Sequence, residues 1–336
     1  MVIWPSSSYA YSFFLKGVTN VKIGYRTIKT ATGTPIAIWI AQMLSLTNFA
    51  SAGILTILCI QNTRKRSIVS ASSRFAACLL AMLFSFLIFE TVGYHPLAIG
   101  LMLILFIPAT VKLNIKEGIV TSSVIILHLY SYKNIDQETL LNEFLLIVVG
   151  IGVALLLNLY MPSLEGKLRE KQRLVEDNFQ VMLKEIATFL RTGDQMWSGK
   201  ELTDTASLLE EAKSLSYKDV ENHILRNHHA YYHYFQMRLK QFELLERMLP
   251  LISRIHHTSE QSIMIADFFD ELADHVHPGN TAVIFLEQIK EMKQKFKESD
   301  LPESREEFES RASLFTLLNE IEQYLIIKRS FKKSDI

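Results

Sequence analysis

Long apolar runs fill the first 162 of the 336 residues, and they constrain the fold more than any other feature of the chain. A helix needs roughly 20 apolar residues to cross the hydrocarbon core of a bilayer. Inside lipid every backbone polar group must be satisfied within the protein, so such runs are expected to be helical. Candidate spans are residues 28–46, 49–60, 75–93, 97–111, 119–130 and 141–160.

The number of spans depends on the shorter runs. The first, third and sixth are close to full length, whereas the second, fourth and fifth must recruit polar flanks or cross with little tilt. We expect six spans, with four spans plus re-entrant pieces as the alternative. Small residues at 33 and 37, at 50 and 53, and at 150, 152 and 154 would let neighbouring helices approach closely.

Basic residues set the expected orientation, because Lys and Arg favour cytoplasmic loops. Residues 1–162 hold 11 basic and 5 acidic residues. Ten of these 11 basic residues precede the first run, stand at its start, or lie between the second and third or the fourth and fifth runs. Lys133 is the exception. This distribution predicts a multi-pass membrane protein with both termini in the cytoplasm.

The second half of the chain reads as a soluble, all-helical domain. Leu168, Val175, Met182 and Phe189 recur every seven residues, a helical apolar stripe. Further helices are expected at 203–215, at 232–255 with a kink or break at Pro250, at 259–275, at 281–297 with Asn280 as N-cap, and after a capping box of Ser304 and Glu307. No alternating strand pattern occurs.

These observations predict an all-α protein: a polytopic bundle of about six membrane spans followed by a cytoplasmic helical bundle. The expected boundaries are an amino-terminal extension over residues 1–21, a membrane domain over 22–162 and a cytoplasmic domain over 163–336.

Several functional classes find no support in the sequence. The net charge of zero gives no basic surface for nucleic acid. The two cysteines, Cys59 and Cys78, lie in apolar runs and provide neither a disulfide framework nor a metal site. His229 and His233 could share a helix face, but no HExxH motif or matching carboxylate accompanies them. We therefore expect no catalytic residues, no metal and no cofactor.

Polar residues at membrane depth are the functional candidates, because they are costly in lipid. A path for an organic anion would begin at Arg26 and Lys29 and continue along Thr30 and Thr34. Its remaining candidates are Ser122, Ser123 and Asn158. Protonatable groups near the outer side, the candidates for proton coupling, are Glu90, His95 and His128, and Glu143 is a further ionisable residue near the start of the last run. The alternative is that Arg26 and Lys29 merely anchor the chain at the lipid headgroups.

Several strings resemble the aromatic acid exporter family of Gram-positive bacteria. In the membrane half they are KIGYRTIKTA at 22–31, ASAGILTILCIQ at 50–61, GYHP at 93–96, KEGIVTSS at 116–123 and NLYMP at 158–162. In the second half they are YYHYF at 231–235, ERMLP at 246–250 and HVHPGNT at 275–281.

The resemblance implies an exporter of small aromatic or other organic acids. Relatives usually carry two six-helix modules, so a chain with one module is expected to work as a homodimer in the lipid bilayer. The competing hypothesis is a membrane-anchored sensor or scaffold that acts through its cytoplasmic helical domain.

Overall fold

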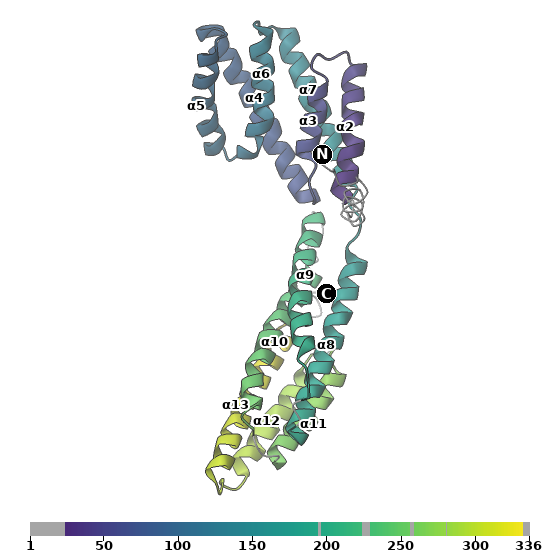
Figure 1. Ribbon diagram of the computed structural model, residues 1–336, viewed down its shortest axis with the longest axis vertical. Helices are drawn as coiled ribbons and strands as arrows, with labels where there is room; N and C mark the ends of the chain where they lie inside the picture. The colour runs from purple at the N-terminus through teal and green to yellow at the C-terminus, as the bar shows by residue number, and fades with distance from the viewer. Residues whose placement is uncertain (1–23, 194–195, 224–228, 256–258, 280, 332–336) are drawn as a thin grey trace, which may run out of the picture. The chain divides into compact units, whose positions relative to one another are not determined.

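The computed structural model describes residues 24–193, 196–223, 229–255, 259–279 and 281–331, and throughout these segments the regular structure is helical (Figure 1). The chain divides into two compact units, Met1–Met161 and Pro162–Ile336, called here the N-terminal and the C-terminal unit. The expected all-α class is confirmed for the described residues. The expected extension at 1–21 lies outside them.

The described part of the N-terminal unit contains six α-helices, and each overlaps one of the apolar runs, although the third begins at Arg64, eleven residues before the run at 75–93. Their bounds are α2 Tyr25–Met43, α3 Ala50–Cys59, α4 Arg64–Val92, α5 Pro96–Lys112, α6 Ile119–Tyr132 and α7 Gln137–Leu159, with a short 3-10 turn at Lys116–Gly118 before α6. The helix starts follow local chemistry: the Thr63 hydroxyl accepts the Arg66 N–H, the Asp136 carboxylate accepts the Thr139 N–H, and Pro96 occupies the first turn of α5.

Helix lengths separate two membrane-span candidates from the other helices. Within the described segments, α4 with 29 residues and α7 with 23 are the two helices long and apolar enough to cross a membrane. The ten residues of α3 extend only about 15 Å, half of the hydrocarbon thickness. The first connection also differs from expectation. Because α2 ends at Met43, residues 44–49 form a longer turn in which Ser45 and Asn48 adopt positive φ.

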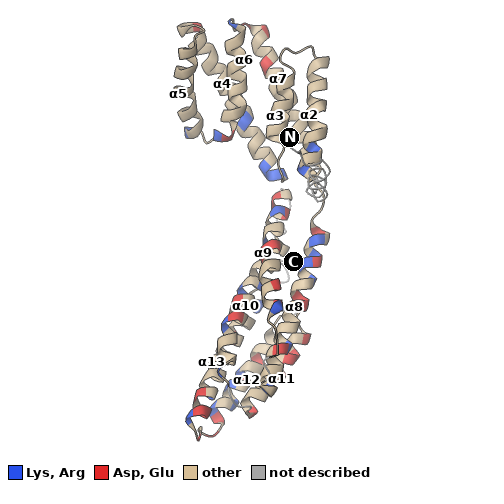
Figure 2. Ribbon diagram, viewed as in Figure 1, with Lys and Arg blue, Asp and Glu red and all other residues tan. Residues whose placement is uncertain are grey.

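The N-terminal unit exposes large apolar side chains, and many of its buried positions hold small or polar residues. Its exposed residues include Leu97 at 86%, Ile104 at 71% and Leu156 at 69% relative accessibility. Its fully buried positions include alanines, serines and threonines, among them Ala37, Ala41, Ala52, Thr56, Ala77, Ser85 and Thr121. Figure 2 shows these helices largely free of charge, with Lys and Arg gathered where α2 and α4 begin and α5 ends. This distribution is typical of helices packed in lipid.

Glycine brings α3 and α7 into close contact. A Cβ added at Gly150 would lie 2.6 Å from Leu55 Cβ and 2.8 Å from the Ala52 carbonyl oxygen. The Thr56 hydroxyl hydrogen-bonds to the Ala52 and Gly150 carbonyl oxygens at 2.8 and 2.9 Å. Gly152, which the sequence also suggested as a contact position, has open space where its Cβ would be. Only the first of these two glycines is therefore required by the packing.

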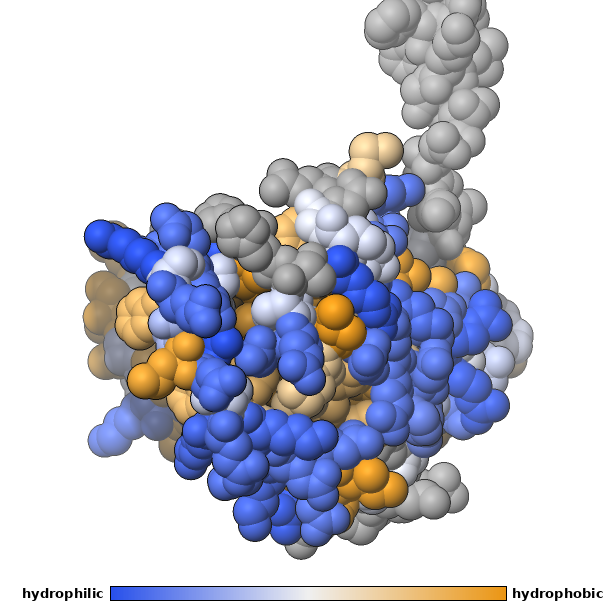
Figure 3. All heavy atoms as spheres, turned by 90° about the horizontal axis from the view of Figure 1, so that it is seen from below, coloured by the Kyte–Doolittle hydropathy of each residue, from blue (hydrophilic) through white to orange (hydrophobic). Residues whose placement is uncertain are grey.

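The C-terminal unit is a bundle of six helices: α8 Glu165–Thr192, α9 Lys200–Asn222, α10 Ala230–Ile252, α11 Glu260–Asp274, α12 Val283–Glu298 and α13 Arg305–Ser330. Its core contains the heptad residues of α8 together with aromatic side chains of α10 and α11, such as Phe235 and Phe269. Its foreground face in Figure 3 is largely hydrophilic with scattered apolar residues, as expected of a water-exposed surface.

Helix ends in the C-terminal unit follow most of the sequence signals. Gly193 ends α8 with φ of 70°, and Ser259 caps α11. Pro250 does not split α10, because it lies only two residues before the helix ends at Ile252. Ser304 caps α13 as expected, but the Glu307 carboxylate accepts the N–H of Glu303 rather than that of Ser304. Asn280, the expected cap of α12, lies outside the described residues.

The two glycines of α7 provide a matched test of the packing. We expect Gly150→Ala to destabilise the N-terminal unit by about 1–3 kcal/mol, because the new methyl group overlaps backbone and Cβ atoms of α3. Gly152→Ala should be neutral or slightly stabilising, because it adds a methyl group in open space of the same helix. Thermal unfolding of the purified protein in detergent compares the two. Equal melting temperatures would contradict the close α3–α7 contact.

Candidate functional site

Helix α7 carries buried polar side chains near both of its ends. Glu143 is fully buried and Asn158 is 2% exposed. Gly150 lies between them, seven residues from the first and eight from the second, so all three share one face of the helix. A rise of about 1.5 Å per residue separates Glu143 from Asn158 by roughly 22 Å, much of the thickness of a bilayer core. The residues of the candidate site are arranged along this face of α7.

The first polar cluster surrounds the ammonium group of Lys29 on α2. The side chain is 4% exposed, and its Nζ lies 3.3 Å from Asn158 Oδ1 and 3.4 Å from Met161 Sδ. The Tyr25 ring centroid is 4.9 Å from the same Nζ. Within the described segments no carboxylate forms an ion pair with Lys29. A buried cation is therefore held by dipoles and a ring face alone, and a carboxylate at this point would complete its charge balance.

The Lys29 cluster is tied to two other helices. Asn158 Nδ2 donates to the Cys59 carbonyl oxygen at 3.3 Å, which links α7 to the end of α3. The Tyr25 hydroxyl donates to the Tyr160 carbonyl oxygen at 3.4 Å, and the two tyrosine rings lie 6.2 Å apart. Both tyrosines are exposed, and the Tyr25 ring lies between the ammonium group and the Tyr160 ring in this chain of contacts. The cluster thus combines a cation, an amide and one aromatic face, with a second ring next to the first.

The second polar cluster lies at the other end of α7. His128 Nδ1 on α6 is 2.9 Å from Glu143 Oε2, and His128 Nε2 is 3.0 Å from Ser51 Oγ on α3. Glu143 Oε1 accepts a longer contact of 3.4 Å from Asn142 Nδ2. A fully buried carboxylate next to an imidazole can hold or exchange a proton between the two groups. Three helices therefore converge on one protonatable pair.

The turn between α2 and α3 is hydrogen-bonded to α6 and α7 near this pair, and it covers that end of the bundle. The Thr47 N–H donates to Asn142 Oδ1 at 2.8 Å, and the Thr47 and Tyr132 hydroxyl oxygens are 2.5 Å apart. Asn48 Nδ2 also donates to the Tyr132 hydroxyl at 2.9 Å. These bonds hold the turn against α6 and α7. The resulting cover could open only if several hydrogen bonds broke together.

Between the two clusters the α2–α3–α7 interface offers threonine hydroxyl groups. Thr56 bonds to carbonyl oxygens of α3 and α7, as described above. The Thr34 Oγ1 atom on α2 is buried and has no hydrogen-bond partner within the part of the chain that the structure describes. Its methyl group would be 3.0 Å from a Cβ added at Gly53, so the residue lies on the α3 side of α2. An unsatisfied hydroxyl group inside the bundle is a costly feature that a passing ligand could satisfy.

Two of the expected path residues meet in the structure, and others do not. Lys29 and Asn158, 129 positions apart, are in direct contact. Arg26 is exposed, and Thr30 Oγ1 donates to the Arg26 carbonyl oxygen in its own helix. Ser122 Oγ donates to Cys78 Sγ at 3.7 Å and Ser123 Oγ to the Ile119 carbonyl oxygen, both on the α4–α6 side. These serines take no part in the Lys29 cluster.

The three expected proton carriers do not form one group. Glu90 accepts the Tyr94 hydroxyl at 2.6 Å and His95 Nε2 lies 2.9 Å from the Val92 carbonyl oxygen, and both residues are exposed. His128 instead pairs with Glu143. The sequence marked Glu143 as ionisable but gave no partner for it, since the contact joins helices whose packing the sequence does not reveal.

The C-terminal unit buries its own polar network. The Arg238 guanidinium group, 2% exposed, donates through Nε to the Tyr234 hydroxyl and through Nη1 to Gln241 Oε1, both at 3.1 Å. The Tyr234 hydroxyl in turn donates to Glu176 Oε1 at 2.7 Å. Lys328, also buried, has the Pro278 carbonyl oxygen as acceptor at 3.2 Å. The network therefore contains two buried positive charges, Arg238 and Lys328, and one negative charge, Glu176.

This arrangement lowers the pKa of Lys328 from 10.5 to about 7. Burial is the main cause, because it removes water from the ammonium group, and the positive charge of Arg238 adds to it. The negative charge of Glu176 opposes the shift.

Two protein-family models match the chain. The model described as "Aromatic acid exporter family member 1" matches residues 21–161, and the one described as "Putative aromatic acid exporter C-terminal domain" matches residues 165–329. A Bacillus subtilis (strain 168) protein described as "Uncharacterized protein YqjA" is 58% identical over 311 residues, which are 93% of this chain and 97% of that protein.

One solved structure, "Crystal structure of putative membrane protein from Clostridium difficile 630", is similar to 48% of this chain and to 97% of its own chain. The sequence identity is 23% and the TM-score is 0.43.

Lys328 gives the C-terminal unit an expected pH dependence. Its pKa is lower in the folded than in the unfolded chain, so between about pH 7 and 10 the unfolded state binds more protons and this group favours folding as pH rises. At pH 6.5, Lys328→Met should raise the stability of the unit by about 1–4 kcal/mol, because it removes a buried charge. Amide-exchange protection in α13 at pH 6.5 and 8.5 measures the effect, with exposed Lys290→Met as the control. Equal protection in both variants at pH 6.5 would contradict the burial of a charged Lys328.

Proposed function

The chain belongs to the aromatic acid exporter family, and from this membership we propose that it exports small aromatic or other organic acids across the bacterial plasma membrane. The resemblance drawn from the sequence is thereby confirmed, and the family name denotes a transporter rather than an enzyme. In the proposal all six helices of the N-terminal unit cross or enter the bilayer, and both termini lie in the cytoplasm. Two copies of the chain assemble in the membrane.

The observation that carries the proposal is the burial of Lys29 without a carboxylate partner. An ammonium group removed from water requires a compensating negative charge, and the described side chains supply only an amide oxygen, a thioether and a ring face. A carboxylate substrate would supply that charge. The exposed Tyr25 ring beside the ammonium group, and the Tyr160 ring next to it, would contact an aromatic body.

The distribution of basic residues supports a cytoplasmic position for this cluster in the proposed orientation. Arg64, Lys65 and Arg66 begin α4, and Lys112 and Lys116 surround the end of α5, so these helix ends face the cytoplasm by the positive-inside rule. Lys29 stands in the first turns of α2, close to the end of α7 that precedes the C-terminal unit. The anion would therefore be captured from the cytoplasm.

The Glu143–His128 pair supplies the proposed coupling to protons. It lies roughly 22 Å farther along α7, toward the outer side in this orientation. In the proposed cycle, an external proton neutralises the Glu143 carboxylate and weakens the hydrogen bond that it accepts from Asn142, the residue that also binds the α2–α3 turn. The α2–α3 turn then opens, the anion leaves, and the proton continues inward. Thr34 and Thr56 offer hydroxyl groups between the two ends.

A membrane-anchored sensor or scaffold is the second candidate function. One observation favours it: among the described helices, α4 and α7 alone have the length and apolar composition of a membrane span. An anchor needs no more than that. The buried Lys29 and Glu143 clusters favour the transporter, because charged groups inside a bundle serve no purpose in a simple anchor.

Efflux from proteoliposomes tests the exporter directly. We expect vesicles loaded with radiolabelled benzoate to release it when they contain the purified protein, and Lys29→Met to lower the rate at least tenfold, because the substrate carboxylate loses its counter-charge. Lys65→Met, an exposed lysine at the start of α4, is the control and should leave the rate unchanged. Wild-type vesicles that release no acid from a panel of aromatic and aliphatic carboxylates would favour the sensor or scaffold.

The pH dependence of transport tests the proton pair. In wild-type vesicles an imposed pH gradient should accelerate efflux, and Glu143→Gln should abolish this acceleration while leaving slow, gradient-independent exchange, because glutamine cannot take up the proton. Glu90→Gln, an exposed carboxylate hydrogen-bonded to Tyr94, should keep the gradient response. A full response in Glu143→Gln would remove the pair from the coupling mechanism.

A further inference from the structure

The C-terminal unit contains a cavity that plays no part in the proposed transport path. It has a volume of about 240 Å³ and lies between α8, the end of α10 and the segment that precedes α9. Five apolar or aromatic residues form its walls: Ile186, Phe189, Trp197, Leu249 and Ile252. Glu185 and Ser253 are its polar residues. Small-molecule sites share this composition of apolar walls with a few polar groups.

The walls present carbon surface to the cavity. The indole N–H of Trp197 donates to Glu201 Oε2 at 2.8 Å, so the only polar atom of that side chain already has its partner. This bond also fixes the ring in place. The Phe189 ring and the aliphatic side chains of α10 complete a surface suited to a flat, apolar body.

Glu185 brings an uncompensated negative charge to this cavity. It is partly buried, and among the described residues its carboxylate has no ion-pair or hydrogen-bond partner. The neighbouring Lys184 pairs with Asp274 at 2.8 Å, and Arg191, one helical turn beyond the cavity, pairs with Asp267 at 2.7 Å. The basic residues of α8 nearest to Glu185 therefore form ion pairs with other carboxylates and not with Glu185.

Ser253 adds a hydroxyl group to the lining of the same cavity. Its hydroxyl group donates to the Pro250 carbonyl oxygen at 3.0 Å, which leaves the lone pairs of Ser253 Oγ free to accept a hydrogen bond. A protonated amine has three N–H donors and no acceptor, so it matches a carboxylate and a hydroxyl oxygen better than any anion does. Aromatic faces next to the charge also favour a cation.

We propose that this cavity is a binding site for a small organic cation that consists of one aromatic ring and a short chain ending in a protonated amine. The volume is below the range of about 300–1,000 Å³ typical of drug-sized ligands, so a single ring with a short chain is the suitable size. Glu185 would repel an organic acid, which makes this site distinct in charge from the Lys29 cluster. The proposal does not depend on transport.

Two ligands with the same ring and opposite charges test the site. Phenethylamine carries an ammonium group and phenylacetate a carboxylate on nearly identical bodies. The protein has three tryptophans, so the full-length chain with Trp4→Phe and Trp39→Phe leaves Trp197 as the sole indole reporter. We expect phenethylamine to change the Trp197 emission saturably, and phenylacetate to leave it unchanged over the same concentration range.

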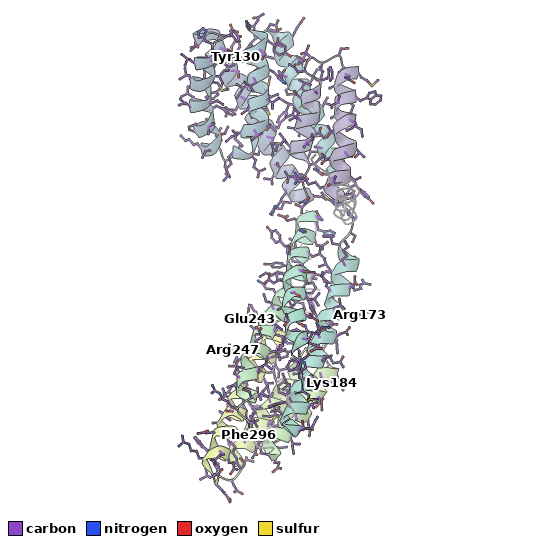
Figure 4. All side chains as sticks on the ribbon, viewed as in Figure 1. Tyr130, Arg173, Lys184, Glu243, Arg247 and Phe296 are labelled. Carbon is purple, nitrogen blue, oxygen red and sulfur yellow. The ribbon has the colours of Figure 1, made fainter. Side chains whose placement is uncertain are left out.

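Variants separate the carboxylate from the apolar walls. Glu185→Gln, nearly identical in shape, should weaken phenethylamine binding at least tenfold, because it removes the counter-charge. Glu243→Gln, an exposed carboxylate on α10 (Figure 4), is the control and should bind as the parent does. Leu249→Phe should abolish binding by filling the cavity, with helical circular dichroism retained.

Three outcomes would overturn the proposal: no saturable change with phenethylamine, an equal response to phenylacetate, or unaltered affinity in Glu185→Gln. None of these outcomes bears on anion efflux from proteoliposomes. The proposal of a cation site and the proposal of an exporter are therefore tested independently.

Discussion

The close approach of α3 and α7 at Gly150 underlies the rest of the N-terminal unit. Without a side chain there, the backbone of α7 lies against Leu55 and Ala52, and the Thr56 hydroxyl joins the two helices through carbonyl oxygens. In lipid such contacts take the place of the hydrophobic effect, because lipid tails are as apolar as leucine. The contact also sets the rotation of α7 about its axis. That rotation points Glu143 and Asn158 into the bundle rather than toward lipid.

The same rotation brings together polar groups from distant parts of the chain. Asn158 meets Lys29 of α2 at one end, and Glu143 meets His128 of α6 at the other. Each cluster contains a charged or protonatable group that would be costly without its neighbours. Because both clusters are placed by a single helix, a small tilt or rotation of α7 would change them together. This shared support is the physical basis on which anion binding at one end and proton binding at the other could be coupled.

The C-terminal unit follows the rules of a protein in water. Its apolar side chains face inward, and charged side chains at or near its surface pair across helices, as Arg247 (labelled in Figure 4) does with Glu320 and Lys293 does with Glu322. The exceptions are informative. Arg238 and Lys328 are buried cations, with Glu176 as the carboxylate that partly balances them, while Glu185 is a carboxylate without a cation beside an apolar cavity. Such departures from charge balance mark the positions where the unit can respond to protons or to a ligand.

The sequence by itself determined the class of the fold and most helix positions. Apolar runs and the heptad of Leu168, Val175 and Met182 are local patterns with a fixed period, and caps such as Ser259 and Ser304 act within one turn, so each is readable from neighbouring residues. The family strings are local in the same sense. Helix ends follow less directly from the sequence. Helix α2 ends at Met43 because residues 44–49 are held by hydrogen bonds to Asn142 and Tyr132, which are remote in the sequence.

Only the tertiary structure decided which polar residues meet. Lys29 and Asn158 were both candidates, yet nothing in their spacing joined them, and Arg26, Ser122 and Ser123 looked equally suitable until the helices were packed. Glu143 acquired a partner for the same reason. A helix face is fixed by sequence to within its period of 3.6 residues, but the neighbour that covers it depends on how several helices rotate and cross. Contacts over 129 residues are therefore properties of the packed bundle and not of any local pattern.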